Sequence, residues 1–220
     1  MQGKLIAIEG LSCSGKSTIM NILENKLKNN ENKYIFCGGF DLDESSSSLT
    51  KLCNQMAQQA TFLKINYIAE FHLLIAEMMN EIFERIIPAI NAGKVVFYNN
   101  YISSVIAFEK GIYYYDKKFK TYIDQTIVNL NKLHELPIPD ITIFVNASIS
   151  TTVKRLELRD DYKDKEVNLI QNNIYEEYLK VLPSDTIFID NETTFENLNS
   201  NIEKLLDNLK EKNILWKIIL

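Results

Sequence analysis

The sequence predicts an α/β fold in which a five-stranded parallel sheet is flanked by helices on both faces. Short apolar runs typical of buried strands alternate with amphipathic stretches typical of helices, and this alternation favours a parallel sheet. The length of 220 residues suits one domain with a sizeable core. Seven glycines and four prolines leave little room for a linker, so we expect residues 1–220 to form a single domain.

The first strand is expected over Lys4–Ile8, and it leads directly into a phosphate-binding motif. Residues Gly10–Thr18 fit the P-loop pattern G-x-x-x-x-G-K-[ST]. Gly10 and Gly15 allow the backbone to turn tightly, so that successive N–H groups point at phosphate oxygens. An amphipathic helix follows through Leu27, and its positive end faces the same anion. A strand before the motif and a helix after it together predict a three-layer P-loop NTPase fold.

The P-loop side chains indicate which groups hold ATP and Mg²⁺. Lys16 places a positive charge on the β- and γ-phosphates, and Ser17 offers its hydroxyl to the metal. Cys13 is interpreted as a small residue that the loop tolerates, with a redox-sensitive thiol as the alternative. Asn191, which follows the last expected strand, is placed near the adenine. The full set expected to contact the nucleotide is Gly10, Ser12, Cys13, Ser14, Gly15, Lys16, Ser17, Thr18 and Asn191.

The second strand is expected over Tyr34–Cys37, followed by an acidic loop, Phe40–Ser48. In parallel sheets the binding crevice forms where the strands end, so this loop is well placed for function. Asp41 and Asp43 either touch the sugar of a ligand, or hold metal through water, or belong to a solvated serine-rich surface loop. The sequence leaves these interpretations open.

Helices are expected over Leu49–Ala60 and over a longer region from Phe62 to Asn91, whose apolar stripe indicates a core-facing side. Pro88 is expected to restart or kink the longer helix near its end. Glu70 and Glu77 lie seven residues apart and therefore on one face, and we expect both to be solvated.

The third strand, Lys94–Tyr98, delivers Asn99, Asn100 and Tyr101 to the edge of the sheet where ligands bind. The elements expected after it are helices over Ser103–Phe108 and Asp116–His134 and a fourth strand over Asp140–Val145.

A helix over Ser148–Leu158 presents Arg155 and Arg159 on one face, next to the charged segment Asp160–Lys165. Two arginines beside a flap predict a lid, about 155–166, that closes on ATP and stabilises the transferring phosphoryl group. The alternative is two surface arginines paired with acidic neighbours. The chain is completed by a helix over Val167–Leu182, a fifth strand over Thr186–Asp190 and a helix over Thr194–Lys212.

Composition excludes several classes of protein. A net charge of −5 and a pI of about 5.2 do not indicate a basic face, so a nucleic-acid polymer is not an expected partner. Three cysteines without a CxxC pair argue against a disulfide scaffold or a zinc site and fit a cytoplasmic protein. No apolar run reaches the length needed to span a membrane. The apolar tail Ile214–Leu220 is expected to pack on the core, with a homodimer contact as the alternative.

Taken together in their order and spacing, several segments resemble the thymidylate kinase family of P-loop nucleoside-monophosphate kinases. The resemblance covers most of the chain and implies a five-stranded parallel sheet, bound ATP and Mg²⁺, and a nucleotide-sized acceptor site. The segments that carry it are the P-loop, Ile87–Val96, Tyr101-x-x-Ser104-x-x-Ala107-Phe108-x-x-Gly111, Leu136-x-x-Pro139-Asp140-x-x-x-x-Val145, and Arg155-x-x-x-Arg159 with Glu166 and Tyr175.

The departures from the family pattern gather on the acceptor side. The third strand of the family ends in Asp-Arg-Tyr, where this chain has Asn99-Asn100-Tyr101. Two neutral amides supply neither the acid that organises metal and acceptor phosphate nor the arginine that grips this phosphate. The family also has an acid at the position of Ser12 and Arg-Glu-Pro after the second strand, and the segment Gly38–Asp43 lacks that arginine and proline.

The long helix also departs from the family pattern. The family offers a phenylalanine that stacks on thymine and an arginine four residues later, and the best alignment places Leu74 and Met78 there. A shift by one helical turn restores Phe71 as the stacking residue but no arginine. The resemblance therefore implies an intact ATP side and a changed acceptor side.

We therefore predict an ATP-dependent phosphotransferase that transfers the γ-phosphoryl group to a nucleotide, nucleoside or similar small acceptor other than dTMP. The catalytic candidates are Lys16, Arg155 and Arg159, and Asp41 or Asp43 is the candidate base. Two alternatives remain: a nucleotide-gated module that signals to a protein partner, and a thymidylate kinase whose contacts have been substituted. The acceptor-site candidates are Asp41, Asp43, Phe71, Leu74, Met78, Asn99, Asn100 and Tyr101.

Overall fold

A computed structural model describes residues 3–38, 47–58, 65–134, 136–158, 165–192 and 195–215. Its centre is a five-stranded sheet with the strand order β2-β3-β1-β4-β5, in which every neighbouring pair is parallel. This arrangement confirms the predicted fold class. The strands are β1 (Lys4–Glu9), β2 (Tyr34–Gly38), β3 (Val95–Asn99), β4 (Ile141–Asn146) and β5 (Ile187–Asp190).

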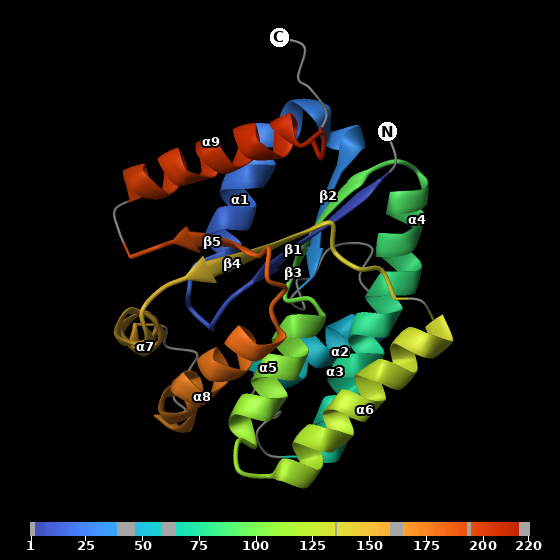
Figure 1. The fold of residues 1–220 in the computed structure, drawn as a ribbon, viewed down its shortest axis with the longest axis vertical. Helices are drawn as coiled ribbons and strands as arrows, with labels where there is room; N and C mark the ends of the chain where they lie inside the picture. The colour runs from blue at the N-terminus through green and yellow to red at the C-terminus, as the bar shows by residue number, and fades with distance from the viewer. Residues whose placement is uncertain are drawn as a thin grey trace.

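Helices cover both faces of the sheet (Figure 1). Helices α1 and α9 pack on one face, and α3, α4 and α6 pack on the other, with α5 and α8 side by side below the end of β4. No helix in the described part of the chain is long and apolar enough to cross a membrane. The helices are α1 (Lys16–Leu27), α2 (Ser48–Gln58), α3 (Tyr67–Glu81), α4 (Ile87–Asn91), α5 (Ile102–Ile112), α6 (Lys117–His134), α7 (Ile149–Glu157), α8 (Lys165–Val181) and α9 (Phe195–Glu211), with a 3-10 segment at Lys28–Lys33.

The two faces of β1 show why the sequences of these strands contain continuous apolar runs. Successive side chains of a strand point to opposite faces. Ile6 and Ile8 lie in the cluster with α1 and α9, whereas Leu5 and Ala7 lie in the cluster with α3, α4 and α6. A strand covered by helices on both faces buries every side chain, so its sequence does not alternate.

The region predicted as one long helix is interrupted just before Pro88. A π-helical turn, Ile82–Ile86, joins α3 to α4, and the N–H of Ile87 donates to the carbonyl of Ile82. Proline has no N–H and its ring clashes with the preceding turn of a regular helix. The wider π turn accommodates Pro88 at the start of α4, which confirms the predicted restart.

The carboxyl ends of the strands bring distant residues to one edge of the sheet. Parallel register pairs Ile8 with Asn99, and Asn99 in turn with Gly38. At the other end of the chain, Ile214 and Leu215 pack into the core, as expected for the start of the apolar tail. Asp41, Asp43, Arg159 and the last five residues of the tail lie outside the described residues.

Candidate nucleotide and acceptor site

The P-loop connects β1 to α1 through a backbone that requires glycine. Gly10 has φ 147° and Gly15 has φ 105°, both in the region that disfavours side chains. A Cβ on Gly10 would lie 2.7 Å from the carbonyl oxygen of Val145, and one on Gly15 would overlap the amide nitrogen of Asn191. The loop is therefore closely packed between β4 and the end of β5, which fixes the direction of its N–H groups.

Lys16 is held inside this loop. Its ammonium donates to the carbonyl oxygens of Gly10 at 2.7 Å and Leu11 at 2.8 Å, and the residue is buried. Ser17 and Thr18 follow in the first turn of α1 and are exposed. A buried cation next to a helix N-terminus and a ring of backbone N–H groups is the donor set that a polyphosphate requires.

ATP and Mg²⁺ fit this donor set. The cradle of N–H groups and Lys16 would hold the phosphates, and the exposed hydroxyl of Ser17 would ligate the metal. Among the described residues, no cluster of three or more His, Cys, Asp or Glu side chains could hold a metal ion by itself. Mg²⁺ beside a nucleotide usually keeps phosphate and water oxygens as its other ligands.

Arg155 ties α7 to the P-loop. Its guanidinium donates to the carbonyl oxygens of Ser14 at 3.2 Å, Cys13 at 3.4 Å and Asn191 at 2.8 Å. The amide of Asn191 also donates to the carbonyl of Ser14 at 2.6 Å. The structure thus brings the predicted Arg155 and Asn191 together beside the P-loop, where the start of the lid segment and the loop after β5 meet.

A buried polar cluster behind the P-loop contains functional candidates that the sequence analysis did not name. Ser104 bonds to the carboxylate of Glu9, and the hydroxyl of Tyr178 lies 2.8 Å from Ser104 Oγ and 3.2 Å from the carbonyl oxygen of Gly10. Burial raises the pKa of Glu9 to about 7, while the Ser104 hydrogen bond and the charge of Lys16 act in the opposite direction. The visible signal was an acid at the end of an otherwise apolar strand.

Asn99 and Asn100 lie at the end of β3, on the sheet edge beside the P-loop strand. Asn99 is buried, and its Oδ1 has no hydrogen-bond partner in the described structure. Asn100 has φ 62°, a left-handed conformation that asparagine adopts more readily than most residues. Its N–H donates to the carbonyl of Ile8, and its Oδ1 lies 3.2 Å from Ser104 Oγ.

The other predicted acceptor residues divide between the core and the space between α2, α3 and α5. Phe71 and Met78 are buried in the core, and Phe71 makes an edge contact with the ring of Phe119. Tyr101 is also buried, and its hydroxyl donates to the carbonyl of Pro137 at 2.8 Å. Leu74 lies with Cys53 in a separate small cluster, against which Val105 and Phe108 pack.

Helix α3 carries buried acids, which corrects the expectation that Glu70 and Glu77 are solvated. Glu70 is fully buried and Glu77 is 5% exposed. Glu77 accepts from the hydroxyl of Thr50 at 3.3 Å, and burial together with Glu81 raises its pKa to about 7. On a helix of mixed composition, charge alone assigned these residues to the surface, but α2 and α5 cover this face of α3.

Glu109 lies next to Glu70 and is fully buried as well. Burial, with a further contribution from Glu70, raises the pKa of Glu109 to about 9, and burial raises that of Glu70 to about 7. Neither carboxyl group has a hydrogen-bond partner in the described structure. Both therefore hold their protons at pH values where an exposed glutamate is ionised.

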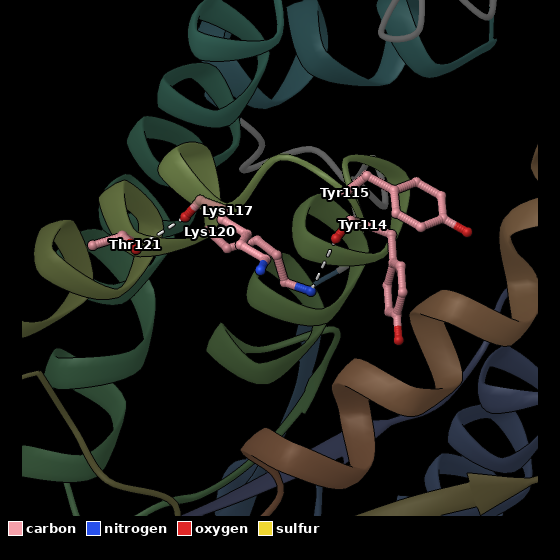
Figure 2. Close-up of a pocket in the computed structure, with 5 residues that line it drawn as sticks. All are labelled: Tyr114, Tyr115, Lys117, Lys120 and Thr121. Carbon is pink, nitrogen blue, oxygen red and sulfur yellow. Dashed lines mark hydrogen bonds between the residues drawn. The ribbon is translucent and has the colours of Figure 1, made fainter.

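A separate hollow of about 460 Å³ lies at the turn between α5 and α6 (Figure 2). Lys120, one of its lining residues, is paired with Glu177 at 2.5 Å and lies over the ring of Tyr114. The hollow is at the end of α5 opposite to Asn100, so it does not belong to the P-loop site. The lining residues are Tyr114, Tyr115, Lys117, Lys120 and Thr121.

The chain is similar to known proteins over most of its length. A family model described as Thymidylate kinase matches residues 8–202. A thymidylate kinase of Orientia tsutsugamushi (strain Ikeda) is 25% identical over 228 residues, which cover 97% of this chain and 97% of that protein. A thymidylate kinase of Mesomycoplasma hyopneumoniae (strain J) is 31% identical over 186 residues, which cover 80% of this chain and 79% of that protein.

Solved structures show the same fold. The thymidylate kinase of Candida albicans superimposes with a TM-score of 0.66 at 23% identity, covering 97% of this chain and 93% of that chain. The thymidylate kinase of Ehrlichia chaffeensis superimposes with a TM-score of 0.66 at 19% identity, covering 95% of this chain and all of that chain.

Proposed function

We propose that this chain, which belongs to the thymidylate kinase family, is an ATP-dependent phosphotransferase whose acceptor is a small hydroxyl compound without a 5′-phosphate. An uncharged nucleoside is the acceptor class that fits best. The observation that carries the proposal is a contrast within one site. The P-loop retains its buried lysine, whereas the end of β3 presents two neutral amides, Asn99 and Asn100.

In the ATP-binding half of the site, the P-loop and its neighbouring side chains would bind the nucleotide. Lys16 and the N–H groups of the P-loop would bind the β- and γ-phosphates, and Ser17 would ligate Mg²⁺. Bound Mg·ATP supplies the phosphoryl group and neutralises part of its charge. Arg155 would keep the P-loop in shape through the carbonyls of Ser14 and Cys13, and Arg159 would add positive charge when the lid closes.

The acceptor half lacks the charges that a phosphate monoester needs. A phosphate dianion is usually gripped by arginine through paired hydrogen bonds. Asn99 and Asn100 offer only neutral amides. Without a cation to pair with the phosphate, this edge would select against a phosphorylated acceptor.

The apolar cluster around Leu74 is the proposed support for the acceptor's base or other flat group. Leu74 and Cys53 are buried between α2, α3 and α5, with Val105 and Phe108 beside them. Apolar side chains with a few polar groups nearby are typical of small-molecule sites. Asn99 Oδ1, which is buried without a partner among the described residues, is a candidate to accept a hydrogen bond from the acceptor.

The test is ADP release from Mg·ATP with a panel of nucleosides, nucleoside 5′-monophosphates and small alcohols. Lys16→Ala serves as the blank, because it removes the P-loop cation. We expect release with an acceptor that carries no phosphate. Release with dTMP at the rate of an ordinary thymidylate kinase would overturn the proposal. If no compound in the panel stimulates ADP release although the protein still binds ATP, the result would instead favour a nucleotide-gated binding module.

A further inference from the structure

A continuous hydrogen-bonded chain runs from Asn100 at the acceptor edge to the P-loop lysine, Lys16. Ser104 Oγ contacts both a carboxylate oxygen of Glu9 and, at 3.2 Å, Oδ1 of Asn100. The hydroxyl of Tyr178 lies 2.8 Å from Ser104 Oγ and 3.2 Å from the carbonyl of Gly10. That same carbonyl accepts from Lys16 at 2.7 Å. Glu9, Ser104 and Tyr178 are all buried, so bulk water does not compete for these bonds.

We propose that Glu9, Ser104 and Tyr178 form a proton-linked relay that positions the amide of Asn100 according to what the P-loop has bound. This inference rests on the proposed function, because Asn100 is placed there in the acceptor site. The three relay residues are positioning residues and do not touch the reacting atoms.

The relay has two possible hydrogen-bonding patterns, which differ in whether Glu9 carries a proton. A serine hydroxyl has one proton to donate. When Glu9 is ionised, Ser104 donates to the carboxylate, because a charge-assisted bond is the stronger one, and Asn100 Oδ1 loses this donor. When Glu9 is protonated, its carboxyl donates to Ser104, and Ser104 donates to Asn100. Protonation of Glu9 therefore anchors the Asn100 side chain, and ionisation releases it.

The hydrogen bond that Tyr178 donates also depends on whether Glu9 is ionised. A serine that donates to a carboxylate is polarised and becomes a better acceptor for a second hydrogen bond. The Tyr178 hydroxyl then favours Ser104. When Glu9 is protonated, it occupies one of the two acceptor sites of Ser104, and Ser104 no longer donates to a charge, so it becomes a weaker acceptor for Tyr178. The bond from Tyr178 to the carbonyl of Gly10 then gains in relative strength, which ties helix α8 more firmly to the P-loop.

Both arrangements are accessible near neutral pH. The second oxygen of Glu9, Oε1, is buried without a hydrogen-bond partner in the described structure, which disfavours the ionised form. Burial raises the pKa of Glu9 to about 7. The groups that act on it from the surrounding elements are Lys16 of α1, Tyr101 and Ser104 at the start of α5, and Tyr178 of α8.

Nucleotide binding would bias the relay through Lys16. The charge of Lys16 lowers the pKa of Glu9 when the P-loop is empty. Phosphates bound at the P-loop add negative charge near Glu9 and draw Lys16 away from the loop carbonyls, and both changes favour the protonated carboxyl. Nucleotide binding should therefore be accompanied by proton uptake, and Asn100 should be anchored only in the loaded enzyme.

The first experiment is titration calorimetry of Mg·ADP at pH 7.5 in two buffers of different ionisation enthalpy. It needs no acceptor, so it tests the relay even if the proposed function fails. We expect the wild-type protein to take up a fraction of a proton more per nucleotide than Glu9→Gln does. Equal proton uptake in the two proteins would overturn the proposal.

The second experiment compares pH profiles from pH 5.5 to 8.5 with an acceptor found in the panel. Because bound nucleotide favours protonated Glu9, we expect the pH profile of the acceptor KM of the wild-type protein to show an ionisation above pH 7. We expect this ionisation to disappear in Glu9→Gln and Ser104→Ala, with the profile of kcat less changed. Ser103→Ala, on the same helix, is the matched control. An unchanged acceptor KM profile in Ser104→Ala would contradict the relay.

Tyr178→Phe removes a single oxygen atom and keeps the packed ring, so it is the variant most certain to fold. We expect a several-fold higher KM for ATP and a pH profile of the acceptor KM that keeps the ionisation seen in the wild-type protein. Tyr114→Phe is its control, because the hydroxyl of Tyr114 bonds to Glu176 outside the relay. Identical kinetics in Tyr178→Phe and the wild-type protein would remove Tyr178 from the relay.

Discussion

The guanidinium of Arg155 donates a hydrogen bond to the carbonyl oxygen of Ser14, so helix α7 is tied directly to the backbone of the P-loop. A second bond, 2.8 Å long, joins the same guanidinium to the carbonyl of Asn191 after β5. One side chain thus holds the two segments between which the nucleotide is proposed to lie.

Arg155→Ala should raise the KM for ATP by about tenfold, because a hydrogen bond from a charged group contributes about 1.5–3 kcal/mol. The P-loop carbonyls would lose the donor that orients them. The matched control is Lys154→Ala, which removes an exposed cation one residue away on the same helix. Steady-state kinetics at saturating acceptor measure the effect, and an equal KM for the two variants would show that Arg155 does not shape the loop.

Asn100→Arg should raise kcat/KM for dTMP by about tenfold or more, because it restores a phosphate-gripping cation at the end of β3. Asn100→Gln adds length without charge and should leave dTMP turnover unchanged. Arginine tolerates the φ of 62° less well than asparagine does, so a loss of about 1 kcal/mol in stability is expected as well. No gain with dTMP in a folded Asn100→Arg protein would place the acceptor phosphate elsewhere.

Glu109→Gln should raise the melting temperature at pH 8 by more than it does at pH 5. In the unfolded chain this carboxyl loses its proton near pH 4.5, whereas burial raises the pKa in the folded protein to about 9. The folded state therefore binds more protons between these values, and stability falls as the pH rises from about 4.5 to about 9. Glutamine does not titrate and removes this loss.

Calorimetric melting curves at the two pH values measure this effect. Glu24→Gln, an exposed position on α1, serves as the control and should show no such difference. A pH dependence that persists unchanged in Glu109→Gln would mean that other groups cause it.

Gly111→Ala should destabilise the protein by about 1–3 kcal/mol, as overpacking of a tight contact does. A Cβ at this position would lie 2.5 Å from Cα of Ile174, so α5 and α8 would have to move apart. Denaturant unfolding measures the loss, with Ser103→Ala on the same helix as the control. Equal stability of the two variants would show that α5 and α8 can move apart without a loss of stability.

The strands and the P-loop could be predicted because each has a local cause. Strands buried on both faces favour apolar side chains at successive positions, as in Leu5–Ile8 of β1. The P-loop requires Gly10 and Gly15 for backbone reasons that are visible in one short segment. The restart of the helix at Pro88 could be predicted from the missing N–H of proline, although the π turn that achieves it could not.

The buried polar cluster could not be predicted in the same way. Ser104 and Tyr178 are 74 residues apart in sequence and meet only because α5 packs against α8. Glu70 and Glu77 were assigned to the surface from their charge, and only the packing of α2 and α5 on α3 shows that they are buried. The sequence also could not show that Phe71 packs against Phe119 of α6.

The most direct test of the central claim is the ratio of kcat/KM for a nucleoside and for its own 5′-monophosphate, measured with Mg·ATP for each common base. Because the two compounds of a pair differ only in the phosphate, the ratio isolates the effect of the acceptor's phosphate on turnover. We predict that the better acceptor of the best pair is the nucleoside. A preference of a hundredfold or more for the monophosphate, with dTMP as the best substrate, would contradict the account.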